Sequence, residues 1–254
     1  MLNIMGLGLR GPRSLTLEEA DILRDSDIVY FETYTSISPE STFDSLKDLC
    51  GGTLKKADRD FIERGMDILV EAKTKIVTLI VTGDALSATT HNEIRMEAKR
   101  LGITANVFEN ASIITAFVSR TGLFNYKMGN IVSMPFVYEN FFPTSVYDKI
   151  YLNYSNNMHT LLLLDLADGK TMPPYQALLT LIGMEEKRKK QIITGDTEVI
   201  VGIGIATENE EIINSSIKNI IGNRIAGYPA SIIIPAGLNE KEREFLDAFS
   251  IKIP

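Results

Sequence analysis

The chain has 254 residues, a length that suits two domains of ordinary size. Its hydrophobic fraction of 44% and charged fraction of 23% are typical of a globular protein with enough apolar material for a core. The formal net charge of −7 argues against non-specific binding to nucleic acid or to an anionic membrane, because such binding depends on excess Lys and Arg.

Cysteine and histidine are scarce, and this limits the kinds of site that the chain can build. Cys50 is the only cysteine, which excludes a disulfide within the chain. Thiolate clusters and a structural zinc site are implausible with one cysteine and two histidines, so we expect no metal. The first residues lack the pattern of a signal peptide, and the longest apolar runs are too short to span a bilayer. We expect a cytoplasmic protein without a membrane partner.

Strands and helices alternate through the first half of the chain. Apolar runs predict strands at residues 2–7, 27–31, 53–55, 75–80 and 104–108. Helices are predicted at residues 16–24, 42–49, 61–73, 93–101 and 112–120. The first begins with a capping box, because Thr16 can cap it and Glu19 follows three residues later. Such alternation indicates parallel strands joined by right-handed crossovers.

The regular alternation of strands and helices ends at residues 122–129, and we predict a domain boundary there. An N-terminal α/β domain would cover residues 1–123 and a C-terminal α/β domain residues 124–254. In the second half, strands are predicted at residues 130–134, 160–166, 198–205 and 231–234, helices at 146–154, 174–188 and 239–249, and loops at 209–211 and 222–224. The less regular order predicts a mixed sheet.

The segment 81–91, Val-Thr-Gly-Asp-Ala-Leu-Ser-Ala-Thr-Thr-His, carries the most information about function. It joins a buried strand to a helix, and ligands bind at the carboxyl ends of parallel strands. Gly83 permits close backbone approach, Asp84 supplies a negative charge and Ser87 offers a hydroxyl. An ordinary strand-to-helix turn with an N-cap explains this segment equally well.

A glycine loop follows the first predicted strand. Gly6, Gly8 and Gly11 match the dinucleotide-binding pattern, and Glu32 stands near the spacing of a ribose-binding acid. Pro12 and the cap at Thr16 move the helix start several residues beyond Gly8, which weakens the case for a nicotinamide-dependent oxidoreductase. The alternatives are a wide turn with glycines at positive φ, or an open loop on which a flat cofactor lies.

Five segments together resemble a known family. They are Gly6-Leu7-Gly8-Leu9, the run 30–36 (Tyr-Phe-Glu-Thr-Tyr-Thr-Ser), Gly83-Asp84 with Ala88-Thr89-Thr90-His91, Phe142-Pro143-Thr144-Ser145 with Tyr147-Asp148, and the run 159–165 (His-Thr-Leu-Leu-Leu-Leu-Asp). From residue 2 to about residue 235 the chain is similar to the diphthine synthase branch of the tetrapyrrole methylase superfamily.

The resemblance implies two α/β domains, with a mainly parallel sheet in the first and a mixed sheet in the second. It implies S-adenosyl-L-methionine as cofactor, in a cleft between the domains, and a homodimer. The cofactor contacts that it implies are Leu9, Asp84, Ser87, Ser112, Ile113, Leu164, Ile205 and Ala230. The chain departs from the family pattern at Ala85, where Pro is common, at Ser87, where an aliphatic residue is more frequent, and at Ala230, where His is usual.

The resemblance also implies a protein substrate, elongation factor 2. One histidine of this factor carries a 3-amino-3-carboxypropyl group, whose amino nitrogen would be methylated three times. The attacking amine must be neutral, yet a free alkylammonium is largely protonated at pH 7. The candidates for accepting its proton are Glu32, Tyr34, His91 and Asp165.

Each candidate has a structural alternative, and positioning alone could carry most of the rate. Glu32 could end a strand on the surface, and Tyr34 could pack between domains. His91 could cap the next helix, and Asp165 could hold a backbone amide. Other functions also stay open. One is a corrin C-methyltransferase on the same fold, although residues 34–36 argue against it. The other is a non-catalytic module that binds a nucleotide-like ligand.

Overall fold

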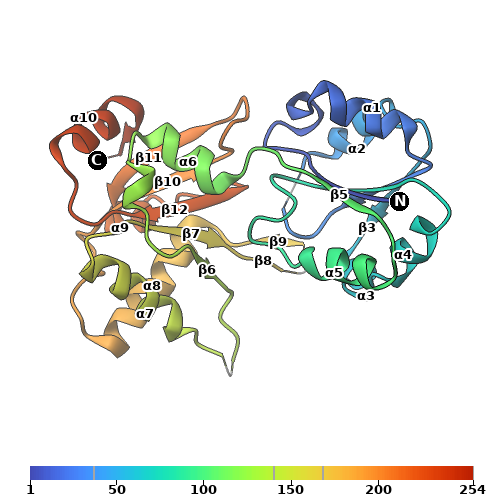
Figure 1. Ribbon diagram of the computed structural model, residues 1–254. Helices are drawn as coiled ribbons and strands as arrows, with labels where there is room; N and C mark the ends of the chain where they lie inside the picture. Colours follow the sequence, from blue (N-terminus) through green and yellow to red (C-terminus); the bar gives the residue numbers. More distant parts are fainter. Residues whose placement is uncertain (37, 140, 168, 254) are drawn as a thin grey trace. The chain divides into compact units, whose positions relative to one another are not determined.

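The computed structural model describes residues 1–36, 38–139, 141–167 and 169–253. The chain divides into two compact units, Met1–Ile113 and Ile114–Pro254, each with its own sheet (Figure 1). Helix α6 (Ile113–Thr121) follows directly on the first unit. The boundary that the sequence suggests, after residue 123, lies beyond this helix and stays a prediction.

The first unit contains a five-stranded sheet in which every strand pair is parallel, as predicted. Its strand order is β3-β2-β4-β1-β5. The strands are β1 (Leu2–Gly6), β2 (Ile28–Glu32), β3 (Thr53–Ala57), β4 (Val77–Val81) and β5 (Ala105–Phe108). The three central strands are buried at every position, because helices cover both faces of the sheet.

One face of this sheet is covered by α1 (Leu17–Asp25) and α2 (Glu40–Lys47), and the other by α3 (Arg59–Arg64), α4 (Met66–Ala72) and α5 (Asn92–Arg100) (Figure 1). The predicted capping box of Thr16 and Glu19 opens α1. The single helix predicted over residues 61–73 is wrong. Gly65 adopts a φ of 60°, which ends α3 and starts α4, and this left-handed conformation favours glycine.

The second unit contains a six-stranded mixed sheet, which confirms the prediction for this half. Strand β10 runs antiparallel to β11 and β12, β12 antiparallel to β7, and β6 parallel to β7. The strands are β6 (Val132–Met134), β7 (Thr160–Leu164), β10 (Glu198–Ile203), β11 (Glu211–Ser216), β12 (Ala230–Ile234) and β13 (Ile251–Lys252), with a separate ribbon of β8 (Leu166–Ala167) and β9 (Lys170–Thr171).

Strand β11 is an element that the sequence analysis did not predict. It begins at Glu211, the last residue of the predicted loop at 209–211, and α9 (Ile217–Gly222) comes directly after it, capped by the Ser216 side chain. The polar residues of β11 weaken the apolar pattern by which a strand is predicted from sequence. Ser215 is nonetheless buried, because its hydroxyl donates to the Ile253 carbonyl at 2.7 Å.

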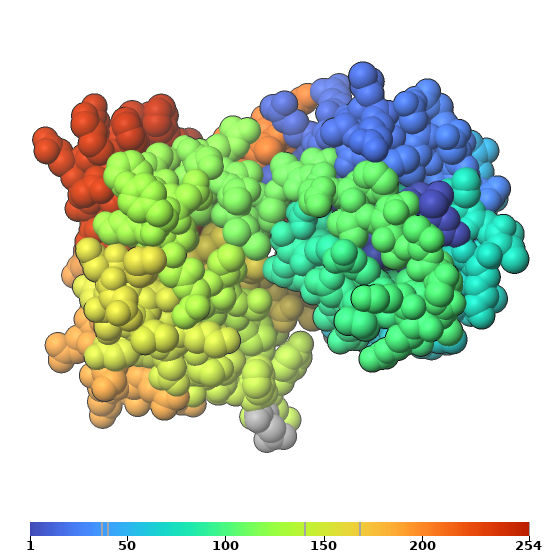
Figure 2. Space-filling view, in the orientation of Figure 1, coloured from blue at the N-terminus to red at the C-terminus, as the bar shows by residue number. Residues whose placement is uncertain are grey.

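Helices pack on both faces of the second sheet. The main apolar core lies between the sheet and three helices, α7 (Thr144–Ser155), α8 (Pro174–Arg188) and α9. On the opposite face Phe117 of α6 lies over Gly202, where a Cβ atom would come within 2.5 Å of the ring. Helix α10 (Glu240–Phe249) lies beside the segment that follows α6, and the red and light-green surfaces meet in Figure 2. Short 3-10 turns lie at Gly11–Ser14 (η1) and Asn125–Lys127 (η2).

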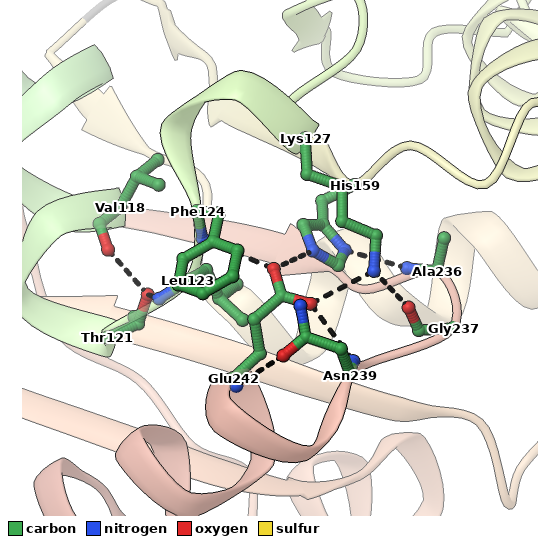
Figure 3. Close-up of polar contacts among 10 residues, drawn as sticks. All are labelled: Val118, Thr121, Leu123, Phe124, Lys127, His159, Ala236, Gly237, Asn239 and Glu242. Carbon is green, nitrogen blue, oxygen red and sulfur yellow. Dashed lines mark hydrogen bonds and ion pairs between the residues drawn. The ribbon is translucent and has the colours of Figure 1, made fainter.

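A buried carboxylate joins α10 to the rest of the second unit (Figure 3). One oxygen of Glu242 accepts from His159 Nε2 at 2.9 Å and from the Phe124 amide at 3.2 Å. The other accepts from Lys127 Nζ at 2.9 Å and from the Asn239 amide at 3.1 Å. Because Glu242 is fully buried, these donors replace the water that its charge would otherwise require.

The tautomer of His159 follows from its partners. Nδ1 accepts a hydrogen bond from the Ala236 amide at 3.0 Å, so the hydrogen is on Nε2, which donates to Glu242. Burial lowers the pKa of His159 and outweighs the opposing effect of the Glu242 charge. Burial alone would raise the pKa of Glu242, but the hydrogen bonds from His159, Lys127 and the amides lower it to about 2. The folded protein therefore favours a neutral imidazole beside an ionised carboxylate.

These pKa shifts predict loss of stability in acid. Both groups have a lower pKa in the folded than in the unfolded chain, so their contribution is complete at neutral pH. It falls below pH 6.5 for His159, and between pH 4.5 and about 2 for Glu242. We expect Glu242→Gln to lower the free energy of unfolding by about 3 kcal/mol at pH 7, and the deficit to narrow at pH 3. Urea unfolding at the two pH values measures both.

The matched control is Glu244→Gln on the same helix, since the Lys241–Glu244 pair is exposed and should contribute less than about 1 kcal/mol. An equal deficit for Glu242→Gln at both pH values would contradict the assigned charge state.

Candidate functional site

The loops that follow β1 and β4 are joined by their backbones. The amide of Gly8 donates to the Gly83 carbonyl, and the amide of Gly83 donates to the Gly8 carbonyl, both at 2.9 Å. Gly8 and Gly83 have φ values of 66° and 80°, and a Cβ atom on Gly6 would lie 2.6 Å from the Gly83 oxygen. The glycines therefore permit close backbone approach at positive φ, one of the interpretations that the sequence left open.

Asp84 fixes the loop after β4 through both carboxylate oxygens. Oδ1 accepts from the Leu86 amide at 3.1 Å and from the Ser87 hydroxyl at 2.7 Å. Oδ2 accepts from the Asn110 amide at 3.3 Å. The carboxylate thus links this loop to the segment that follows β5.

Asn110 completes the frame, and the sequence analysis missed it. Its side-chain amide donates to the carbonyls of Gly6 and Ser14, both at 3.1 Å. The loops after β1, β4 and β5 are therefore cross-linked by Asp84 and Asn110. The only signal for Asn110 in the sequence is its place just after a predicted strand, where short polar side chains often bond to the backbone.

The structure gathers the predicted cofactor contacts of the first unit at the carboxyl end of its sheet. They follow β1, β4 and β5, and each is half-buried, so part of its surface is open to solvent. These residues are Leu9, Asp84, Ser87, Ser112 and Ile113. The half-buried side chains combine apolar surface with a fixed negative charge and hydroxyl groups.

The predicted contacts of the second unit also share one end of their sheet. Leu164 ends β7, Ala230 begins β12, and Ile205 follows β10 closely. In the antiparallel register Ala230 pairs with Ile203. Ile205 is buried, whereas Leu164 and Ala230 are half-buried against the core of this unit.

Glu32 and His91 form a buried pair in the first unit. His91 Nε2 lies 3.1 Å from Glu32 Oε2, and neither side chain is more than 1% exposed. His91 Nδ1 lies 2.8 Å from the Ala85 carbonyl, which can only accept, so this nitrogen carries a hydrogen. His91 Nε2 is a buried nitrogen without a hydrogen-bond partner, so it lies near the Glu32 carboxylate without bonding to it.

The pair connects two loops. Glu32 Oε1 accepts from the Tyr34 amide at 3.1 Å and from the Thr35 amide at 2.6 Å, which shapes the loop after β2. The surface position considered for Glu32 is wrong, since only 2% of the residue is exposed. His91 occupies the N-cap position of α5, but its side chain bonds to Ala85 instead of capping the helix. The loops that follow β2 and β4 are therefore brought together by the buried side chains of Glu32 and His91.

The other two candidate proton acceptors differ from this pair. Tyr34 packs against the first unit's core, and its ring lies 5.1 Å from the Arg59 guanidinium. Burial raises the pKa of Tyr34, and the Glu32 charge raises it further, which makes Tyr34 a poor base at pH 7. Asp165 lies in the second unit and accepts from the Phe136 amide at 3.1 Å, the structural role considered for it.

Comparison with known proteins identifies the family. A family model described as tetrapyrrole (corrin/porphyrin) methylases matches residues 1–221. The chain belongs to this family. It is 41% identical over 250 residues to a diphthine synthase of Thermoplasma acidophilum, covering 98% of the chain and 96% of that protein. It is 39% identical to a diphthine synthase of Staphylothermus marinus, covering 93% of the chain and 88% of that protein.

Solved structures agree with this assignment. A crystal structure of a diphthine synthase superimposes with a TM-score of 0.87 at 27% identity, over 100% of this chain and 97% of that one. A conserved hypothetical protein from Aeropyrum pernix gives a TM-score of 0.89 at 28% identity, over 98% of this chain and 89% of that one. The chain is an enzyme, a methyltransferase of diphthamide synthesis, as the resemblance implies. Each helix in the described residues lacks the length or the apolar character to cross a membrane.

The coupling between Glu32 and His91 can be measured by a double-mutant cycle. Glu32→Ala and His91→Ala each leave one buried partner without the other, so each should lower the free energy of unfolding by about 3–5 kcal/mol. The double variant should lose less than the sum by at least about 1 kcal/mol. Urea unfolding of the four proteins measures this.

The exposed pair Arg59–Glu63, at 4.0 Å, is the control, and its coupling should stay below about 1 kcal/mol. Additive losses at Glu32 and His91 would show that the contact does not stabilise the fold.

Proposed function

We propose that this methyltransferase transfers methyl groups from S-adenosyl-L-methionine to a modified histidine of elongation factor 2. The acceptor is the amino nitrogen of the 3-amino-3-carboxypropyl group, which is methylated three times to give diphthine. The observation that carries the proposal is the 41% identity to a diphthine synthase over 98% of the chain.

The half-buried residues at the carboxyl end of the first sheet fit this cofactor. Leu9 and Ile113 offer apolar surface for an adenosine, and Ser87 and Ser112 offer hydroxyl groups. When bound, the cofactor supplies a sulfonium methyl group that an amine can attack. The Asp84 carboxylate, held by the Leu86 and Ser87 donors, favours that positive charge.

We extend the proposal to Leu164, Ile205 and Ala230 as cofactor contacts. Their common position at one end of the second sheet supports it. Ala230 has no polar side chain where the family usually has His, so its contact would be made by the backbone.

Positioning is the main contribution that we assign to the chain. Methyl transfer to an amine is an in-line displacement with a good leaving group, so alignment and exclusion of water supply most of the rate. The amine must lose a proton before each of the three transfers, because only the neutral amine can attack the methyl group. Glu32 and His91 remain candidates to hold it, because their side chains lie 3.1 Å apart next to the 83–91 loop. Tyr34 and Asp165 remain weaker candidates.

A transfer assay tests the proposed function. Elongation factor 2 bearing the histidine adduct should gain three methyl groups from labelled S-adenosyl-L-methionine, counted by mass spectrometry. Factor without the adduct should gain none. Failure of the wild-type protein to methylate the adduct would overturn the proposal, and methylation of a corrin substrate instead would select the alternative within the family. Size-exclusion chromatography with light scattering tests the homodimer, which we also propose.

The cofactor site has its own test. We expect Asp84→Ala to weaken S-adenosyl-L-methionine binding at least tenfold in calorimetry, because the variant loses a charge near the sulfonium and an anchor of the loop. Asp84→Asn keeps an acceptor for Leu86 and Ser87 but removes the charge, so it separates these two effects. Wild-type affinity in both variants would count against the assigned site.

A further inference from the structure

A pocket opens in the first unit where β2 and β3 end. Its volume is about 260 Å³, and its wall includes Glu32 at the end of β2, Phe43 of α2 and Lys56 of β3. Pockets that hold whole small ligands typically measure about 300–1,000 Å³. This pocket therefore suits the end group of a side chain better than a complete nucleoside.

One side of the pocket is suited to an anion. Lys56 is exposed, and its ammonium nitrogen lies 5.0 Å from the centroid of the Phe43 ring. Among the described side chains, no carboxylate lies within ion-pair distance of it, whereas the neighbouring Lys55 pairs with Glu71 at 3.5 Å. The Lys56 ammonium group thus places a positive charge at the pocket wall.

The start of α2 adds to the same side. Pro39 lines the pocket and holds the N-cap position of α2, and no side chain caps this helix. The uncapped first amides carry the positive end of the helix dipole, which favours an anion. Lys56 and the start of α2 therefore supply charge of the same sign to the same pocket.

The pocket adjoins the loop that we assign to the cofactor. The hydroxyl of Ser38, in the pocket wall, lies 2.8 Å from the Thr82 hydroxyl, two residues before Asp84. Glu32, in the same wall, reaches the Ala85 carbonyl through His91. Both contacts lie within the first unit, so a group held in the pocket lies next to the 83–91 loop.

We propose that this pocket binds the amino-acid end of a 3-amino-3-carboxypropyl group. The carboxylate contacts Lys56 and the start of α2, and the amino group lies at the end of β2, where Glu32 and Thr33 form the wall. Two molecules carry this group, the modified histidine of the substrate and S-adenosyl-L-methionine itself. The pocket residues are not among the predicted cofactor contacts, which favours the substrate, and this part rests on the proposed function.

Lys56→Ala tests the pocket, with Lys55→Ala as the matched control on the same strand. We expect Lys56→Ala to raise KM for the modified factor about tenfold and to leave kcat within about twofold of the wild-type value. Lys56→Arg should return most of the way to the wild-type KM. Lys55→Ala should leave KM and kcat unchanged. Calorimetry with S-adenosyl-L-methionine on the same variants identifies the ligand, and thermal melting confirms that they fold.

The outcomes separate this inference from the proposed function. A raised KM with unchanged cofactor affinity assigns the pocket to the substrate. A weakened cofactor affinity also supports an amino-acid pocket, but assigns it to the cofactor. If neither quantity changes while the wild-type protein methylates its substrate, the pocket proposal is overturned and the proposed function stands. If the wild-type protein methylates nothing, the proposed function fails, and cofactor calorimetry alone decides the pocket.

Discussion

The reciprocal backbone pairing of Gly8 and Gly83 is the constraint on which the site depends. It holds the loops after β1 and β4 at a separation that leaves no room for a Cβ atom on Gly6. Asp84 and Asn110 can form hydrogen bonds between these loops because the pairing already holds the loops close together. The glycine pattern, which by its spacing suggests a pyrophosphate site, instead allows the two loops to pair through their backbones.

The chain has two histidines, and each lies beside a buried glutamate. The two pairs use the ring differently. His91 directs an Nδ1 hydrogen to the Ala85 carbonyl, whereas His159 accepts at Nδ1 from the Ala236 amide. In the second pair a neutral ring therefore donates to an ionised carboxylate, whereas in the first pair Nε2 lies near the carboxylate without a hydrogen bond. Loops are tied by the first pair, and the final helix is fixed by the second.

Local patterns predicted much of this fold. The apolar runs of β1, β2 and β4 identified buried parallel strands, and Thr16 with Glu19 identified the start of α1. Local patterns failed where distant contacts decide the structure. Strand β11 contains polar residues whose partners lie elsewhere in the chain, as Ser215 bonds to the Ile253 carbonyl, and Gly65 breaks a helix whose apolar stripe is otherwise continuous.

At the candidate site, too, local sequence patterns did not reveal contacts between residues far apart in the chain. Sequence patterns located the loops after β1, β2 and β4, and named Asp84, Glu32 and His91. They could not find that Glu32 and His91 touch, or that Asn110 joins three loops, because these contacts span tens of residues. The charge at Lys56 was missed for a related reason. Nothing in the sequence distinguishes it from Lys55, and only the alternation along β3 directs the two ammonium groups to different partners.

The anchoring of α10 by Glu242 has a consequence for the order of folding during synthesis. The first unit is continuous in sequence and complete at Ile113, so it is free to fold while the ribosome is still adding the second. The second unit cannot complete its packing before helix α10 has been synthesised. Lys127 and His159 lack their carboxylate partner until Glu242 has been added, 83 residues after His159, so their donors stay hydrated until then.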